Sequence, residues 1–172
     1  MRAARTRSDA RVHFDEGPAP GTSAQLPFAS ALSLLAGGIH AGIAGEHLAL
    51  WWVYGVFFLV VAAAQAICGV LLAWHATSPV LFLGLWGNVT VIGVYVWSRV
   101  SGFVPPAAEA AEPAHLGGPE TVGLLDLTAL LAELALVAVL VTRLDARWRR
   151  GTTNALFALA LLAVGLRLSG SL

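Results

Sequence analysis

Several polar side chains that could do chemistry lie inside long apolar stretches of the sequence. The clearest are His40, Asp126 and Glu133, and two amides, Gln65 and Asn88, accompany them. An ionised carboxylate near the centre of a bilayer costs at least roughly 2.5 to 3.5 kcal/mol on insertion scales, so such a residue normally faces an interior partner or a water-filled path. Histidine and carboxylate side chains bind first-row transition metals and also carry protons. These residues are therefore the candidates for holding a ligand, a metal ion or a proton.

The composition places the chain in the membrane class. Hydrophobic residues make up 58% of its 172 residues, charged residues make up only 12%, and the mean hydropathy is +0.77. A chain of this length and composition has room for one membrane domain and for no folded soluble domain beside it. Cys68 is the only cysteine, so an intramolecular disulfide and a cysteine-based metal cluster are both excluded.

Five apolar runs are long enough to cross a bilayer, which takes roughly 20 residues of helix. They lie at about 25–45, 50–74, 79–99, 121–142 and 153–169. The predicted fold is therefore an all-α bundle of five transmembrane helices, with residues 24–172 forming a single transmembrane domain. Residues 1–23 are charged and rich in proline and glycine, and we expect them to form a disordered cytoplasmic tail.

The arginines predict the orientation in the membrane. All ten basic residues are arginines, and eight of them lie in two groups. The first group is Arg2, Arg5, Arg7 and Arg11, and the second is Arg143, Arg147, Arg149 and Arg150. Arginine in the short flanks of membrane spans is retained on the cytoplasmic side. Five alternating spans place both groups on that side, so we expect the N-terminus in the cytoplasm and the C-terminus outside it. The connection at 143–151 is then a cytoplasmic loop, and the one at 100–120 is an outer loop.

The expected topology gives each polar residue a depth, counted at about 1.5 Å per helical residue. His40 and Asp126 both fall roughly 7–9 Å beneath the outer surface, so the two side chains could meet. A deeper tier near the middle of the bilayer consists of Gln65, Asn88 and Glu133. Further candidates at the outer rim are His47, Arg99 and Glu120. This distribution predicts a polar pocket that opens on the outer side of the membrane.

The spacing along the helices restricts any metal site. His40 and His47 are seven residues apart, as are Asp126 and Glu133, so each pair shares one helix face but is separated by two turns. One ion cannot take both members of either pair from a straight helix. A metal ion would draw its ligands from different spans, and His40 with Asp126 is the pair that we expect.

Structural roles compete with these functional ones. Glu133 is either a protonated group hydrogen-bonded to Gln65 or Asn88, which ties helices together, or a residue for transport, proton transfer or ligand binding. The structural alternative for Asp126 is a pair with Arg99 or with the histidine at position 40. The sequence leaves both alternatives open.

Familiar motifs add little. Gly38 and Gly42 form a GxxxG pattern, which permits close helix packing but is expected by chance in a chain with 18 glycines. No phosphate-cradling loop, HExxH motif, nucleophile elbow or CxxC pair is present, so nothing points to an enzyme class. The basic clusters lie beside membrane spans, where anionic lipid explains them better than nucleic acid does.

A family resemblance is carried by HAGIAGEHLALWWVYGVFFLVVAAAQ, by the span with Asn88, and then by WSRVSG and PETVGLLDLTALLAEL. These segments resemble a group of small uncharacterised multi-spanning membrane proteins of high-GC, actinobacterial-type bacteria, over about residues 36–136. The resemblance implies a four- or five-span protein of the bacterial cytoplasmic membrane, but it supplies no substrate. The polar signature that it implies is His40, His47, Trp51, Gln65, Asn88, Arg99, Glu120, Asp126 and Glu133.

Three functions are compatible with the sequence. The first is a binding or accessory component of the bilayer with a polar pocket in its outer half, for which a transition metal or haem is the candidate ligand. The second is a transporter or proton-conducting subunit in which Glu133 titrates between an outer vestibule and a cytoplasmic exit. The third is an assembly partner of another membrane subunit or of a second copy of this chain. An enzyme is the least favoured reading, because no nucleophile and base are recognisable.

Overall fold

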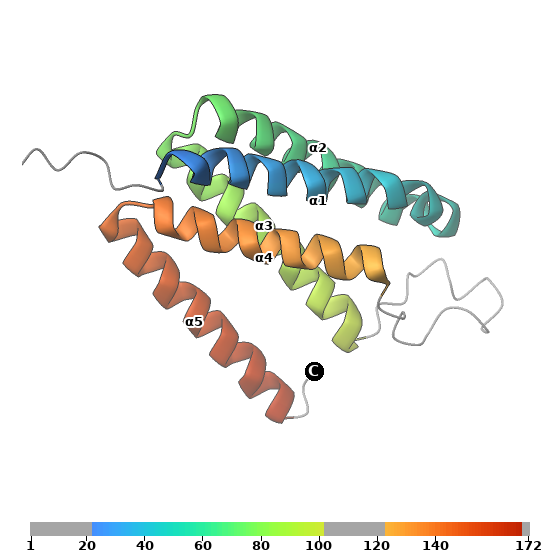
Figure 1. The fold of residues 1–172 in the computed structure, drawn as a ribbon. Helices are drawn as coiled ribbons and strands as arrows, with labels where there is room; N and C mark the ends of the chain where they lie inside the picture. Colours follow the sequence, from blue (N-terminus) through green and yellow to red (C-terminus); the bar gives the residue numbers. More distant parts are fainter. Residues whose placement is uncertain (1–21, 102–122, 170–172) are drawn as a thin grey trace, which may run out of the picture.

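The computed structural model of the chain describes residues 22–101 and 123–169, and these residues form five α-helices (Figure 1). The helices are α1 (Thr22–Leu50), α2 (Trp52–Trp74), α3 (Ser78–Ser101), α4 (Leu124–Arg143) and α5 (Ala146–Leu168). Each is long and apolar enough to cross a membrane, which confirms the predicted all-α, multi-pass fold. Apart from Thr22 and Ser23, the tail expected at 1–23 lies outside the described residues, as does Glu120.

The two largest differences from the prediction are at helix ends. Helix α1 continues to Leu50, five residues beyond the expected end, because the link to α2 is a single extended residue, Trp51 (φ −161°, ψ 121°). Helix α5 begins at Ala146 rather than near residue 153, so most of the basic segment expected as a loop at 143–151 is helical. Arginine is a good helix former, and its long side chain lets the charge reach polar surroundings from a helix end.

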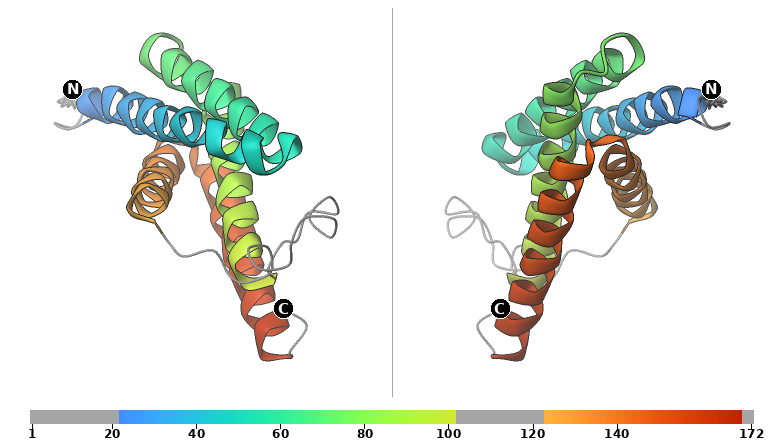
Figure 2. Two further views of the ribbon diagram at one scale, coloured as in Figure 1. Left: turned by 90° about the vertical axis from the view of Figure 1, so that its right-hand side faces the viewer. Right: turned by 90° about the vertical axis from the view of Figure 1, so that its left-hand side faces the viewer.

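Four of the helices form the bundle, and the fifth leaves it. Helix α1 packs against α2 and α4, and α3 packs against α4 and, more lightly, against α2. Figure 1 shows α5 diverging from α4 after the tight connection between them, and the two views of Figure 2 show α3 and α5 steeply inclined to α1 and α2. Within α5, Thr152 is the only buried residue. Any interior site among the described residues therefore belongs to α1–α4.

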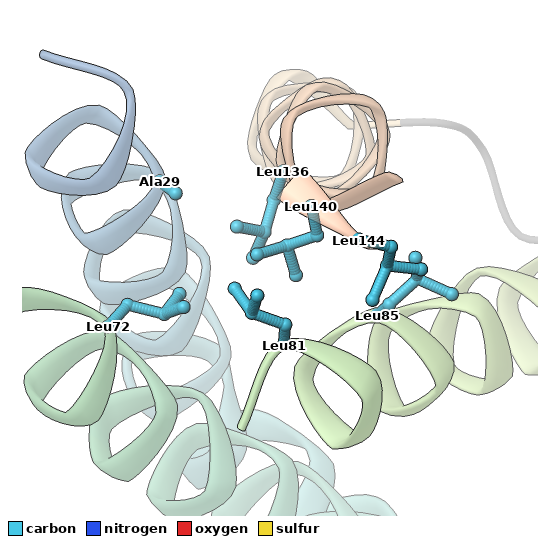
Figure 3. Close-up of a cluster of buried hydrophobic side chains, with 7 residues drawn as sticks. All are labelled: Ala29, Leu72, Leu81, Leu85, Leu136, Leu140 and Leu144. Carbon is cyan, nitrogen blue, oxygen red and sulfur yellow. The ribbon is translucent and has the colours of Figure 1, made fainter. Parts of the chain in front are cut away.

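A cluster of aliphatic side chains fills one end of the bundle (Figure 3). It lies where α1 begins and α4 ends, and its members come from α1–α3 and from α4 with the residue after it: Ala29, Leu72, Leu81, Leu85, Leu136, Leu140 and Leu144. We call this end of the bundle the leucine end. Four of these leucines, Leu72, Leu85, Leu136 and Leu140, are fully buried, so the cluster forms an apolar core at this end of the bundle.

Helices α1 and α2 approach each other closely through small residues. The hydroxyl groups of Ser30 and Ser33 donate hydrogen bonds of 2.7 Å to the carbonyl oxygens of Gly69 and Gln65. A Cβ added at Gly37 would lie 3.1 Å from a backbone carbonyl oxygen of α2, whereas one added at Gly38 or Gly42 would meet nothing within 4 Å. The GxxxG glycines therefore lie off this interface, and the serines beside it were not singled out from the sequence.

The close approach predicts opposite effects for two glycine substitutions. A Cβ at the buried Gly55 would lie 2.7 Å from the Leu48 Cα, so Gly55→Ala forces the backbones apart. We expect it to destabilise the protein by about 1 kcal/mol, measured by reversible unfolding in mixed micelles. Gly38→Ala adds its methyl group to open space and should leave stability unchanged or raise it by up to about 1 kcal/mol. Equal losses in the two variants would contradict this packing.

Candidate functional site

Four buried polar residues, one from each helix of the bundle, meet near its centre. They are His40 of α1, Gln65 of α2, Asn88 of α3 and Glu133 of α4, and their exposed fractions are 7%, 4%, 3% and 2%. They lie between 9 and 13 residues from the helix ends opposite the leucine end, which is about 14–20 Å along the helices. The site is therefore assembled by tertiary packing at one depth.

Successive hydrogen bonds connect these four side chains, and we call the four residues the His–Glu network. The Asn88 amide nitrogen donates to the carbonyl oxygen of Gly84 (2.7 Å), and the Gln65 amide nitrogen donates to Asn88 Oδ1 (3.1 Å). The same Gln65 nitrogen donates to Glu133 Oε1 (2.7 Å), and His40 Nε2 lies 3.0 Å from that oxygen. The contact between Glu133 and Gln65 fits the interhelical pairing considered for this carboxyl group, and His40 is an additional member.

His40 belongs to the deep group because α1 is longer than expected. It lies ten residues before Leu50, the last residue of α1, and Glu133 lies nine residues after Leu124, the first residue of α4. Asp126, by contrast, is only two residues inside α4, since that helix begins three residues later than expected. The two residues expected to share an ion, His40 and Asp126, thus lie at different depths and have different partners.

Asp126 forms a second polar group near the end of α4. Its Oδ2 atom lies 2.9 Å from Arg99 Nη2 and accepts a hydrogen bond from the backbone N–H of Gly123 (3.1 Å). The Arg99 guanidinium also lies over the ring of Tyr95, 5.0 Å from its centroid. Asp126 is therefore paired with Arg99, which is one of the two structural alternatives considered from the sequence. This pair joins α3 to α4.

The expected metal pair, His40 and Asp126, is divided between these two groups. Among residues 22–101 and 123–169, no three His, Cys, Asp or Glu side chains come together in a way that could hold a metal ion. His40 and Glu133 do lie within 3.0 Å of each other, but their other neighbours in the His–Glu network are amides. The geometry of the described residues thus provides a hydrogen-bonding site rather than a metal cage.

A cavity of about 400 Å³ lies at the end of the bundle opposite the leucine end, and we call it the aromatic cavity. His40 and Glu133 line its deep part, while Arg99 and Asp126 line it near the helix ends. Half of its remaining lining residues are aromatic: His47, Trp51, Tyr54, Phe57, Phe58, Tyr95 and Trp97. An apolar cavity of this size with a few convergent polar groups is the usual form of a small-molecule site.

Aromatic contacts hold the α1–α2 side of the cavity together. The ring of Phe58 lies 5.5 Å from that of His40 and 4.2 Å from that of His47. The His47 side chain also lies within hydrogen-bonding distance of the carbonyl oxygen of Ile43, with Nδ1 2.9 Å away. His47, expected at the rim, is therefore a wall residue with its own backbone partner.

Two atoms of the His–Glu network have unused hydrogen-bonding capacity. His40 Nδ1 and Gln65 Oε1 are buried without a hydrogen-bond partner among the described residues. Both hydrogen bonds that Glu133 makes there go to Oε1. A buried polar atom without a partner costs about 1–3 kcal/mol. A ligand or water that reaches this site would remove that penalty.

Sequence reasoning missed the aromatic wall of the cavity. The sequence analysis names His47 as a rim candidate and Trp51 through the family resemblance, but it does not consider Tyr54, Phe58 or Tyr95. A signal existed, because His47, Trp51, Tyr54 and Phe58 follow one another at intervals of four, three and four residues across the α1–α2 link. Their convergence depends, however, on the single-residue link.

Comparisons with known proteins add no assignment. No protein-family model, no curated protein and no solved structure matches the chain. The resemblance to small membrane proteins of high-GC bacteria therefore stays a prediction, and the site is interpreted from its own geometry.

Proposed function

We propose that this multi-pass membrane protein is a binding protein whose aromatic cavity takes up one small, largely apolar molecule. The observation that carries the proposal is the buried His40–Glu133 pair, with 3.0 Å between Nε2 and Oε1, at the deep part of a cavity of about 400 Å³. The rings would hold the apolar body of the molecule. The His–Glu network would bind its polar group.

The position of the polar groups supports binding rather than a purely structural role. Packing alone would favour full pairing of buried polar atoms, since each unpaired one is costly. In this site His40 Nδ1 has no partner among the described residues, and it belongs to a cavity-lining residue. An assembly partner would need no such cavity, so that alternative has less support from the geometry.

The leucine end argues against proton conduction through Glu133. A conducting path needs polar groups or water on both sides of the carboxyl group, as intramembrane proton relays have. Beyond the His–Glu network, the described interior toward the start of α1 holds the apolar cluster around Leu85, Leu136 and Leu140. The buried hydroxyls of Ser30 and Ser33 in this region donate to backbone carbonyl oxygens of α2. Wild-type protein in liposomes is therefore expected to carry no measurable proton flux under a pH gradient, and a flux that Glu133→Gln abolishes would contradict this reading.

The proposal includes the orientation derived from the arginines, in which the leucine end of the bundle faces the cytoplasm of a bacterial cell. Helix α1 begins and α4 ends at the leucine end, so Arg143, Arg147, Arg149 and Arg150 lie on the side from which the chain enters α1, and the positive-inside rule favours the cytoplasm for that side. A reporter fused after Arg150 should behave as cytoplasmic, and one inserted at Ala111 as external. External activity from the fusion at Arg150 would overturn the orientation.

Filling the cavity provides the test of binding. Ala129 is a buried residue of the cavity wall, and Ala129→Phe would occupy part of the space. Wild-type protein in nanodiscs should bind the fluorescent probe 1-naphthylamine saturably, and Ala129→Phe should lower the affinity by about tenfold or more. The control is Ala138→Phe, which adds the same ring to an exposed position of α4. Saturable binding that is absent, or that Ala129→Phe leaves intact, would reject the proposal.

A further inference from the structure

The hydrogen-bond directions in the His–Glu network define which ligand the aromatic cavity suits. The Gly84 carbonyl oxygen can only accept, so the Asn88 group facing it must be the amide nitrogen, and Asn88 Oδ1 must face Gln65. Gln65 therefore presents its own nitrogen to both Asn88 and Glu133. The orientation of each amide follows from its neighbour, and Glu133 Oε1 is an acceptor.

The same argument continues to His40. Because Glu133 Oε1 already accepts from Gln65, a carboxylate that also accepts from His40 Nε2–H satisfies both contacts. His40 Nδ1 is then a lone-pair acceptor in the neutral ring. In an imidazolium it would be a buried N–H without a partner among the described residues, which is the costlier arrangement for a charged group. The deep part of the cavity thus presents lone-pair acceptors, and it presents one negative charge when Glu133 is ionised.

The other charges that line the cavity cancel. The Arg99 guanidinium and the Asp126 carboxylate lie 2.9 Å apart, so together they add no net charge at the cavity mouth. An anionic ligand would face Glu133 without a free countercharge, and a neutral ligand would leave the carboxylate uncompensated at membrane depth, where that is costly. With Glu133 ionised, a cation is the ligand charge that balances the site.

The aromatic wall also suits a cation. The faces of aromatic rings attract positive charge, by about 2 kcal/mol or more in desolvated sites. The ring of Phe58 lines the cavity beside His40, and the ring of Tyr54 lines it nearer the helix ends. Ligand pockets span about 300–1,000 Å³, so a cavity of about 400 Å³ is small. Its volume suits a molecule with one or two rings.

We infer that the ligand is a small organic monocation, an amine or quaternary ammonium on an apolar body, whose charge lies against an ionised Glu133. This inference rests on the proposed function, because it names the ligand class of the same cavity. It adds the sign of the charge and the residue that recognises it.

Three probes of one shape and different charge test the inference. Benzyltrimethylammonium is the cation, neopentylbenzene replaces its nitrogen with carbon, and phenylmethanesulfonate is the anion. Binding to the protein in nanodiscs is measured by tryptophan fluorescence, since Trp51 and Trp97 line the cavity, and empty nanodiscs correct for partition into lipid. We expect the cation to bind about tenfold tighter than neopentylbenzene and the anion to bind the weakest.

Substitutions at position 133 identify the residue responsible. Glu133→Gln keeps the shape and removes the charge, so it should abolish the preference for the cation while neopentylbenzene still binds. Glu133→Asp retains the charge and should keep part of the preference. Glu46→Gln removes a carboxylate from an exposed position on α1 outside the cavity lining and should change nothing.

The outcomes separate the two proposals. If neopentylbenzene or the anion binds as tightly as the cation, or if Glu133→Gln keeps the preference, the inference about charge is overturned and the binding cavity stands. If none of the probes binds saturably, and 1-naphthylamine does not bind either, the proposed function falls and the inference falls with it.

Discussion

In a double-mutant cycle, we expect His40→Ala and Glu133→Ala each to destabilise the protein by about 1–2 kcal/mol, and the double variant to lose little more than either single one. Each single substitution removes the contact of 3.0 Å between Nε2 and Oε1 and leaves the other buried group without that partner. Side-chain hydrogen bonds between membrane helices contribute about 0.6 kcal/mol on average and up to about 1.7. Reversible unfolding in mixed micelles measures the losses.

A second cycle provides the control. His40→Ala and Asp126→Ala affect residues with different partners, so their losses should add to within about 0.5 kcal/mol. Asp126→Ala breaks the pair with Arg99 and the hydrogen bond to the Gly123 backbone. A coupling between His40 and Asp126 that equals the one between His40 and Glu133 would contradict the separation of the two polar groups.

The sequence was sufficient to predict the number and approximate positions of the helices, because the thickness of the bilayer fixes the length of each apolar run. A helix that crosses a bilayer needs about 20 apolar residues, and each run of that kind corresponds to one of the five helices. The ends were less certain, since charged and aromatic residues near a membrane surface are compatible with either helix or loop. The arginines at 147–150 illustrate this, because they lie within α5 rather than in a loop.

The candidate site depended on those ends. Gln65, Asn88 and Glu133 were placed at one depth from helix centres, which are robust, and the structure brings them together. His40 was placed by its distance from the end of α1, and a shift of five residues at that end moves it by about 7 Å. Its pairing with Glu133 instead of Asp126 follows from that shift.

The cavity could not be predicted from single-helix patterns. Its walls come from α1–α4 and from Trp51 between α1 and α2, and the aromatic residues of α2 and α3 are also typical of membrane interfaces. Which of them face inward depends on the close α1–α2 contact at Ser33 and Gly37. That contact rests on small residues whose sequence signal is weak.

Truncation within the leucine cluster tests the bundle itself. Leu136 is fully buried, and we expect Leu136→Ala to destabilise the protein by about 2 kcal/mol. In water-soluble cores the cost of Leu→Ala is about 2–5 kcal/mol, which combines lost transfer energy with the cavity left behind. A leucine on a separated helix in lipid is already in an apolar medium, so mainly the cavity contribution remains.

Leu131 is the matched control on the same helix, because its side chain is 57% exposed and faces away from the cluster. Leu131→Ala should change the free energy of unfolding by less than about 0.5 kcal/mol. The difference between the two variants depends on the inward direction of α4, which also directs Glu133, three residues before Leu136, toward the bundle interior. If the two leucines cost the same, α4 would not present this face to the bundle, and the placement of Glu133 beside His40 would lose its support.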